Sequence, residues 1–233
     1  MTDAKPPANP AAPGAESESA GSLRMILTMG GIGLVSGILI VLTFQWTLPV
    51  ITRNKAVALE RAIFEVVPGA KTKAAFKLVG NRLQPLVGED ELAVKYYACY
   101  DAEQRLVGVA LEAQGQGFQD VLKVLYGYSP RKNGVVGLKV LESKETPGLG
   151  DKIETDPRFR ANFEMLDVAL DGDEVANPIE MVKHGKKTDP WQVEAITGAT
   201  ISSRAVAAIL RGSTVKSVPI IENNLEILKK GNP

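Results

Sequence analysis

Four side-chain hydroxyls lie close together in the C-terminal part of the sequence, just before an apolar run. They belong to Thr197, Thr200, Ser202 and Ser203. Residues 204–211 have helical spacing, so the hydroxyls fall where a helix should begin, after a turn at Gly198. The first N–H groups of a helix lack internal partners and its dipole favours anions, so a phosphate could bind here. On the chemistry alone, ordinary helix capping is the more common role of such hydroxyls.

A glycine-rich loop, residues 143–153, is the second stretch whose composition could serve chemistry. Gly148 and Gly150 would let the backbone approach a flat ligand, and Pro147 would stiffen the loop. Glycine and proline are also the ordinary residues of turns. Taken by itself, the loop is therefore more typical of a simple turn after a strand than of a binding site.

Both stretches resemble motifs of the FMN-binding domain family, which includes the G subunit of the Rnf electron-transport complex and the C subunit of the sodium-translocating NADH:quinone reductase. Thr197-Gly-Ala-Thr200 is similar to the family's [S/T]-G-A-T motif, and Glu145-Thr-Pro-Gly-Leu-Gly150 matches its E-T-P-G-L-G motif in full. In the family, the last threonine carries FMN through a phosphoester bond, and the second motif lies against the isoalloxazine ring. The resemblance therefore implies covalent FMN on Thr200.

The same resemblance implies a set of cofactor-binding residues around Thr200. They are Glu145, Thr146, Gly148, Leu149 and Gly150 in the loop, and Thr197, Gly198, Ala199 and Ser202 near the helix start. Family members usually have an acidic residue, most often Asp, six positions before the modified threonine, within the pattern that a flavin transferase reads. Glu194 occupies that position here, so the charge is kept on a longer side chain.

Other polar residues give weaker signals. His184 is the only histidine, and we expect it on the surface, without a role as ligand or base. Lys186 or Lys187 could approach the phosphate or the flavin ring, or could simply be solvated. Asp171, Asp173 and Glu174 are expected to form a solvated turn, because no complete calcium loop follows. We predict no metal site.

Composition excludes several classes of protein. Cys99 is the single cysteine, which rules out an internal disulfide and any cysteine-ligated cluster or zinc site made by this chain alone; we expect it to be a buried strand residue. The 27 basic and 27 acidic residues balance, which argues against nucleic acid as a partner.

Residues 25–52 contain no charged side chain and predict a membrane anchor. We assign the transmembrane helix to residues 25–49, with Pro49 ending it, because this length spans a hydrocarbon core of about 30 Å at about 1.5 Å per residue. The run exceeds the apolar part of a cleaved signal peptide, which favours a retained anchor. Gly30, Gly33 and Gly37 could pack against another helix or simply face lipid.

The regions flanking the anchor are expected to differ in order. Residues 1–24, rich in Pro, Ala, Gly, Ser and Glu, predict a disordered cytoplasmic tail. Residues 50–70 predict an amphipathic juxtamembrane helix that stops at Pro68-Gly69. Residues 71–233 are then the FMN-binding domain, extracytoplasmic by resemblance. Lys5 and Arg24 before the anchor, against Arg53, Lys55 and Arg61 after it, slightly favour the opposite orientation.

The remaining patterns predict an α+β fold, an antiparallel sheet flanked by helices. Predicted strands cover residues 94–100, 105–113, 121–128 and 135–141, and their short connections indicate a meander with helices to one side. Asp156-Pro157 should begin a short helix. We expect the motif helix to cover 204–211, and Pro219 to begin a second helix or turn that reaches residue 230.

The resemblance implies a single-pass inner-membrane flavoprotein that relays electrons within an ion-translocating ferredoxin:NAD oxidoreductase, without independent substrate turnover. Its expected partners are the other Rnf subunits, a periplasmic FMN transferase and the lipid bilayer. Three alternatives remain: the C subunit of the quinone reductase, a structural or assembly subunit without flavin, and an anchored flavin reductase.

Overall fold

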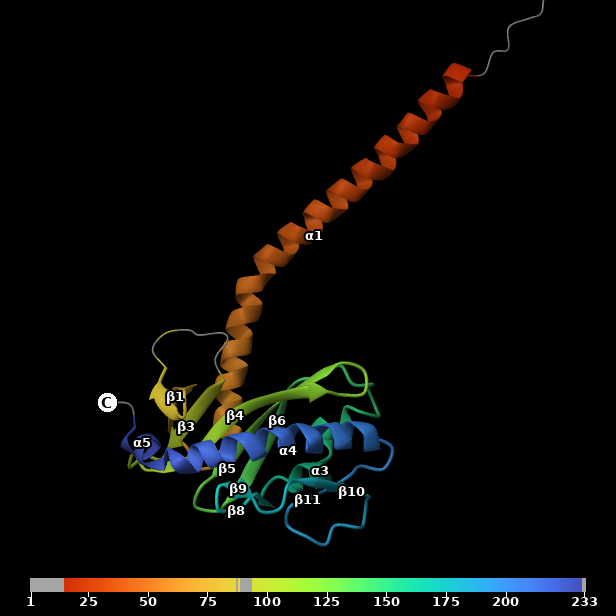
Figure 1. The fold of residues 1–233 in the computed structure, drawn as a ribbon. Helices are drawn as coiled ribbons and strands as arrows, with labels where there is room; N and C mark the ends of the chain where they lie inside the picture. Colours follow the sequence, from red (N-terminus) through yellow and green to blue (C-terminus); the bar gives the residue numbers. More distant parts are fainter. Residues whose placement is uncertain (1–14, 87, 89–93, 232–233) are drawn as a thin grey trace, which may run out of the picture. The chain divides into compact units, whose positions relative to one another are not determined.

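The computed structural model describes residues 15–86, 88 and 94–231, with side chains from residue 22 onward (Figure 1). The chain divides into two compact units, the first ending at Ala56 and the second beginning at Val57. The first unit is helical throughout its described part, and the second contains all the strands.

Helix α1 (Ala15–Val66) is one continuous helix of 52 residues. Between Ser22 and Val66 it is long and apolar enough to cross a membrane. Two expectations were wrong. The helix continues through Pro49, because a proline removes only one helical N–H and apolar membrane segments tolerate that loss. Residues 15–24, assigned to a disordered tail, are its first turns, since no proline follows Pro13 there. Residues 1–14 of that tail lie outside the described part.

The second unit is built on a seven-stranded antiparallel sheet, which confirms the α+β prediction. Its strands are β1 (Thr72–Val79), β2 (Arg82–Pro85), β3 (Lys95–Tyr100), β4 (Leu106–Gln116), β5 (Val121–Ser129), β6 (Gly134–Glu142) and β7 (Leu166–Asp167). Their order is β2-β1-β3-β4-β5-β6-β7. The four predicted strands correspond to β3–β6, but β1 inserts between β2 and β3, so the sheet is not a simple meander.

The remaining elements are helices and two small sheets. They are α2 (Lys152–Thr155), α3 (Pro157–Ala161), α4 (Thr200–Asn223), α5 (Leu225–Lys230), the antiparallel pair β8 (Leu170–Asp171) and β9 (Glu174–Val175), and the parallel pair β10 (Glu180–Val182) and β11 (Gln192–Glu194). Asp156 caps α3 as predicted. The break at Pro219 was wrong: α4 runs through it, because Val218 and Ile221 on either side are fully buried and hold the helix on the sheet.

The two faces of the sheet pack against different helices. Alternate side chains of β5, such as Tyr126 and Tyr128, lie in the larger core with α4, while Leu125 lies in a smaller cluster with the end of α1. Cys99 is fully buried in that smaller cluster, as predicted, and burial raises the pKa of its thiol to about 12. The end of α1 thus covers one face and α4 the other, where α4 lies across β4 and β5 (Figure 1).

Candidate functional site

The turn before α4 places the [S/T]-G-A-T residues at the start of the helix. Gly198 has a φ of +87°, a conformation that side-chain-bearing residues rarely adopt. Ser203 closes the turn: its hydroxyl accepts from Ile196 N at 3.1 Å and donates to Ala199 O at 2.9 Å. Ala199 occupies the cap position and makes no side-chain cap bond. The hydroxyls therefore do not act as ordinary N-caps of this helix.

The Thr200 hydroxyl makes only a weak hydrogen bond within the protein. It is the first residue of α4 and half-buried, and its Oγ1 lies 3.5 Å from Ile196 O, the limit of a hydrogen bond. The first helical N–H with a partner four residues back is that of Ser203, bonded to Ala199 O at 2.9 Å. The N–H groups just before it lie at the positive end of the helix, where a phosphate is stabilised.

The E-T-P-G-L-G loop is joined to the start of α4 by one buried bridge. Glu145 is 7% exposed; its Oε2 accepts from Ser202 Oγ at 2.7 Å and its Oε1 accepts from Phe118 N at 2.7 Å. Glu145 and Ser202 are 57 residues apart in the sequence. Their contact brings the two motifs together, and it also commits both side chains to the protein's own structure.

The rest of the loop forms a tight turn. Thr146 O accepts from the N–H groups of Leu149 and Gly150 at 3.1 and 3.0 Å, and Gly148 has a φ of +77°. A Cβ on Gly150 would lie 2.5 Å from Glu145 Oε2, so this glycine is required by the bridge itself. Of the predicted loop residues, Leu149 presents its side chain to solvent, 52% exposed.

Three exposed apolar side chains belong to the segments that the bridge joins. Phe118, Leu149 and Ile201 are 57%, 52% and 52% exposed. Phe118 was missed by the sequence analysis, where its only signal was an aromatic residue in a glycine-rich break between strands. Exposed apolar side chains beside a polar attachment point suit a flat aromatic ring, so the residues present fit an isoalloxazine group.

Asp151, directly after the loop, adds a further sign of a ligand. Among the described residues, its Oδ1 is the one buried side-chain oxygen or nitrogen without a hydrogen-bond partner. Buried polar atoms in folded proteins are normally paired, so a donor from a bound molecule would give this oxygen its missing hydrogen bond. Sequence patterns alone did not single out Asp151 as a site residue.

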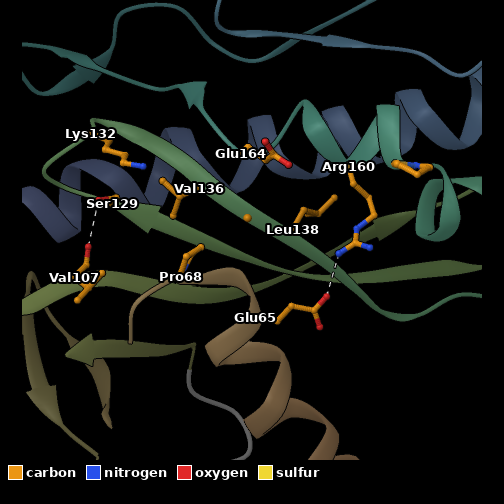
Figure 2. A pocket seen from close by; sticks show the side chains of 11 residues that line it. Glu65, Pro68, Val107, Ser129, Lys132, Val136, Leu138, Arg160 and Glu164 are labelled. Atoms are coloured by element: carbon orange, nitrogen blue, oxygen red, sulfur yellow. Dashed lines mark hydrogen bonds and ion pairs between the residues drawn. The ribbon is translucent and has the colours of Figure 1, made fainter. Parts of the chain in front are cut away.

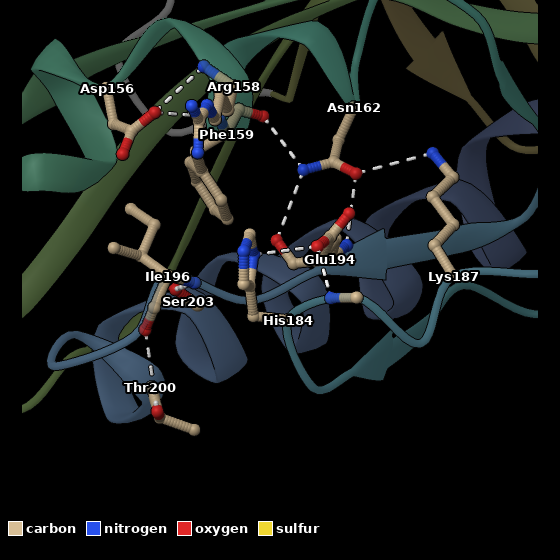
Figure 3. Close-up of polar contacts among 11 residues, drawn as sticks. Asp156, Arg158, Phe159, Asn162, His184, Lys187, Glu194, Ile196, Thr200 and Ser203 are labelled. Atoms are coloured by element: carbon tan, nitrogen blue, oxygen red, sulfur yellow. Dashed lines mark hydrogen bonds and ion pairs between the residues drawn. The ribbon is translucent and has the colours of Figure 1, made fainter.

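Glu194 belongs to a polar network on the strand that precedes the motif (Figure 3). Its Oε1 lies 2.7 Å from His184 Nδ1 and accepts from Gly185 N. His184 is exposed, as expected, but it is paired with Glu194, because β10 and β11 pair and fold the connecting loop back onto that residue. Lys187 donates to Asn162 Oδ1 at 3.3 Å, and burial lowers the pKa of the Lys187 ammonium. Lys186 is exposed.

Two cavities border this part of the molecule. One of about 500 Å³ adjoins the motif and is lined by Lys152, Asp156, Arg158, Phe159, Ala161, His184, Glu194, Ala195, Ile196 and Thr197. A larger one, about 690 Å³, lies beside the end of α1 between Glu65, Pro68, Leu138 and Arg160 (Figure 2). The larger cavity contains no residue of either motif, so the smaller one is the better candidate for cofactor contacts.

Known proteins are similar in sequence to this chain, both in the motif region and over most of its length. The family model described as FMN-binding domain matches residues 117–213. The G subunit of the ion-translocating oxidoreductase complex of Methanosarcina acetivorans is 30% identical over 202 residues, covering 84% of this chain and 95% of that protein. The protein of the same name from Shewanella piezotolerans is 24% identical over 197 residues, covering 83% of this chain and 88% of that protein.

Solved structures share the fold. The crystal structure of NqrC from Shewanella oneidensis gives a TM-score of 0.61 at 19% identity, covering 77% of this chain and 100% of that one. The C subunit of the Na(+)-translocating NADH-quinone reductase from Parabacteroides distasonis gives a TM-score of 0.51 at 22% identity, covering 65% and 78%. These likenesses confirm the predicted fold class.

Proposed function

This chain belongs to the family of G subunits of ion-translocating oxidoreductase complexes and contains an FMN-binding domain, and from this premise we propose that it relays electrons within such a complex through FMN bound covalently to Thr200. The observation that carries the proposal is the bridge between Glu145 and Ser202, which holds the E-T-P-G-L-G loop beside the first turn of α4. Thr200, on that turn, has a hydroxyl with only a weak internal bond.

The proposed attachment is a phosphoryl transfer. The Thr200 hydroxyl loses its proton and its oxygen bonds to the FMN phosphorus, while a P–O bond of a flavin dinucleotide donor breaks and releases a nucleoside monophosphate. No electrons are exchanged in this step. An external flavin transferase would supply the base, because the titratable side chains near Thr200 are already engaged: Glu145 by Ser202, and Glu194 by His184.

Bound FMN would supply electron transfer, since flavins take up and release electrons, and the chain supplies position and electrostatics. The N–H groups of the first turn of α4 stabilise a phosphate on Thr200. Arg204 lies four residues further on the same helix face and is exposed, so its guanidinium can reach that phosphate. Phe118, Leu149 and Ile201 offer apolar surface to the ring.

The experiment that tests attachment is co-expression with a flavin transferase, followed by denaturing gel electrophoresis and detection of flavin fluorescence on the protein band. We expect a fluorescent wild-type band, because only covalent FMN survives denaturation. Thr200→Ala should be dark yet folded, since the bond it removes is already at the 3.5 Å limit. Thr200→Ser keeps the nucleophilic oxygen and should stay fluorescent.

Thr197→Ala is the matched control at the other motif threonine, whose side chain is exposed. It should remain fluorescent. Fluorescence of Thr200→Ala together with a dark Thr197→Ala band would move the attachment to Thr197. A dark wild-type band from correctly co-expressed protein would reject covalent attachment and favour a structural or assembly role.

The remaining parts of the proposal concern the protein's surroundings. We place the second unit outside the cytoplasm, where the transferase acts, and the partners are the other membrane subunits of the complex and the bilayer around α1. The C subunit of the quinone reductase shares the fold, but the relatives matched over most of this chain are named as G subunits of the ion-translocating complex. An anchored flavin reductase would oxidise a nicotinamide nucleotide alone, and we expect no such turnover.

A further inference from the structure

Asn162, at the end of α3, is a buried amide that uses both of its polar atoms twice. Its Nδ2 donates to Phe159 O at 3.0 Å and to Glu194 O at 3.2 Å. Its Oδ1 accepts from Glu194 N at 3.0 Å and from Lys187 Nζ at 3.3 Å. The side chain is 6% exposed. One residue therefore joins α3, the last residue of β11 and the loop between β10 and β11 (Figure 3).

The contact with Glu194 involves the backbone rather than the carboxylate. The Asn162 amide pairs with both the N–H and the C=O of Glu194, as a neighbouring strand would do. On the following residue, Ala195 N donates to Val182 O of β10 at 2.9 Å. The chain is thus fixed on both sides immediately before it enters the turn that leads to Thr200.

Two buried bridges, one to backbone and one between side chains, flank Thr200 in the sequence. Asn162 holds Glu194 before it, and Glu145 holds Ser202 after it. Both bridging side chains come from the segment 145–162, which begins with the E-T-P-G-L-G loop and continues through α2 and α3. Among the described residues, those of the turn 195–201 itself make no side-chain hydrogen bond to that segment.

We propose that Asn162 is a positioning residue for flavin attachment, fixing the backbone before Thr200 so that the hydroxyl and the ring loop keep a constant separation. The inference rests on the proposed function, because it concerns the same site. Its physical basis is that transfer to a hydroxyl requires a defined approach, and a displacement of the nucleophile by about 1 Å can slow such a reaction by up to about a hundredfold.

Asn224 provides a matched control elsewhere in the fold. It is 3% exposed, its Oδ1 accepts from Leu83 N at 3.1 Å, and its Nδ2 donates to Asn81 O and Ile220 O at 3.3 and 2.8 Å. It therefore makes an equivalent buried bridge from an amide to backbone, at the C-terminal end of α4. Asn162→Ala and Asn224→Ala should lower the melting temperature by similar amounts, because each leaves comparable backbone groups unpaired.

The test measures the rate of flavin transfer to the full-length protein in detergent, with purified transferase and flavin dinucleotide, at a temperature where every variant is folded. We expect Asn162→Ala to react at least about tenfold more slowly than wild type, and Asn224→Ala to react at the wild-type rate. In the labelled fraction of Asn162→Ala, flavin fluorescence anisotropy should fall, because the ring is held less firmly.

If Asn162→Ala does not fold, Asn162→Asp replaces it in the rate measurement. It keeps the acceptor for Glu194 N and Lys187 Nζ but loses the donor to Glu194 O, so it too should react more slowly than Asn224→Ala. Equal rates for the Asn162 and Asn224 variants would overturn the positioning role while leaving attachment to Thr200 intact. A wild type that accepts no flavin would instead overturn the proposed attachment, and the positioning role with it.

Discussion

Ser202 illustrates how a motif hydroxyl can serve the fold rather than the cofactor. Its Oγ donates to Glu145 Oε2 at 2.7 Å in a buried setting, so Ser202→Ala leaves a carboxylate oxygen without this donor. A buried acceptor left unpaired costs about 1–3 kcal/mol, and more when it is charged. We expect urea unfolding of Ser202→Ala to show a loss at the upper end of that range.

Ser213→Ala is the control for this prediction. Ser213 Oγ lies 2.8 Å from the hydroxyl of Tyr126, so that pair is neutral and should contribute about 1 kcal/mol. If the two alanine variants were destabilised equally, the Glu145 bridge would not have the charged character that we assign to it.

At the same scale, the sequence named candidate residues but not the contacts that hold them. Thr200, Gly198 and the loop 145–150 lie in short motifs that could be read locally. Asn162 and the pairing of His184 with Glu194 could not be found that way, because their contacts join segments that only the fold brings together. Ser202 was predicted as a cofactor contact, whereas its visible partner is Glu145.

Among the elements, the seating of α1 on the sheet depends on glycines. A Cβ on Gly137 of β6 would lie 2.5 Å from Val66 O, and one on Gly127 of β5 would lie 2.1 Å from the same oxygen. The end of α1 therefore rests directly on strand backbone. We expect Gly137→Ala to displace this end and destabilise the second unit by about 1–3 kcal/mol, as overpacking does.

Gly212→Ala offers the opposite case in the same chain. Gly212 is in α4, and an added Cβ there meets nothing within 4 Å. Alanine favours a helix over glycine by about 0.8–1.0 kcal/mol, so this variant should be more stable than wild type. Thermal unfolding of Gly137→Ala and Gly212→Ala, each compared with wild type, measures the two opposite changes in stability. A Gly137→Ala protein as stable as wild type would show that the end of α1 can pack on the sheet without a glycine at this position.

Local sequence signals predicted the elements unevenly, for a physical reason. Strands β3–β6 are rich in strand-forming residues, lie between clear turns and were found, and Asp156 with Pro157 marked α3 correctly. Pro49 was expected to end a helix and Pro219 to begin a second helix or turn, yet α1 and α4 continue through them. A proline costs about 3 kcal/mol in a helix, and burial of the residues around Pro219 exceeds that cost in a way that local sequence does not reveal.

For the molecule as a whole, the charge pattern and the placement that we propose give different orientations of the membrane anchor. Positive residues usually flank the cytoplasmic end of a membrane helix, and here Lys5 and Arg24 precede the apolar segment while Arg53 and Lys55 follow it. The charge difference is small, so it weakly opposes the extracytoplasmic placement that we propose for the second unit. Sequence alone could therefore predict an anchor and a domain, but not the side on which the domain lies.

A reporter that is active only outside the cytoplasm, fused after Pro233, tests this placement in intact cells. We expect high activity from the wild-type fusion. Arg53→Gln combined with Lys55→Gln should leave activity the same or higher, because these two cations oppose the proposed orientation. Adding positive charge at that end should lower it, since more cations would then resist export. An inactive, fully expressed wild-type fusion would place the second unit in the cytoplasm, where a periplasmic transferase could not reach Thr200.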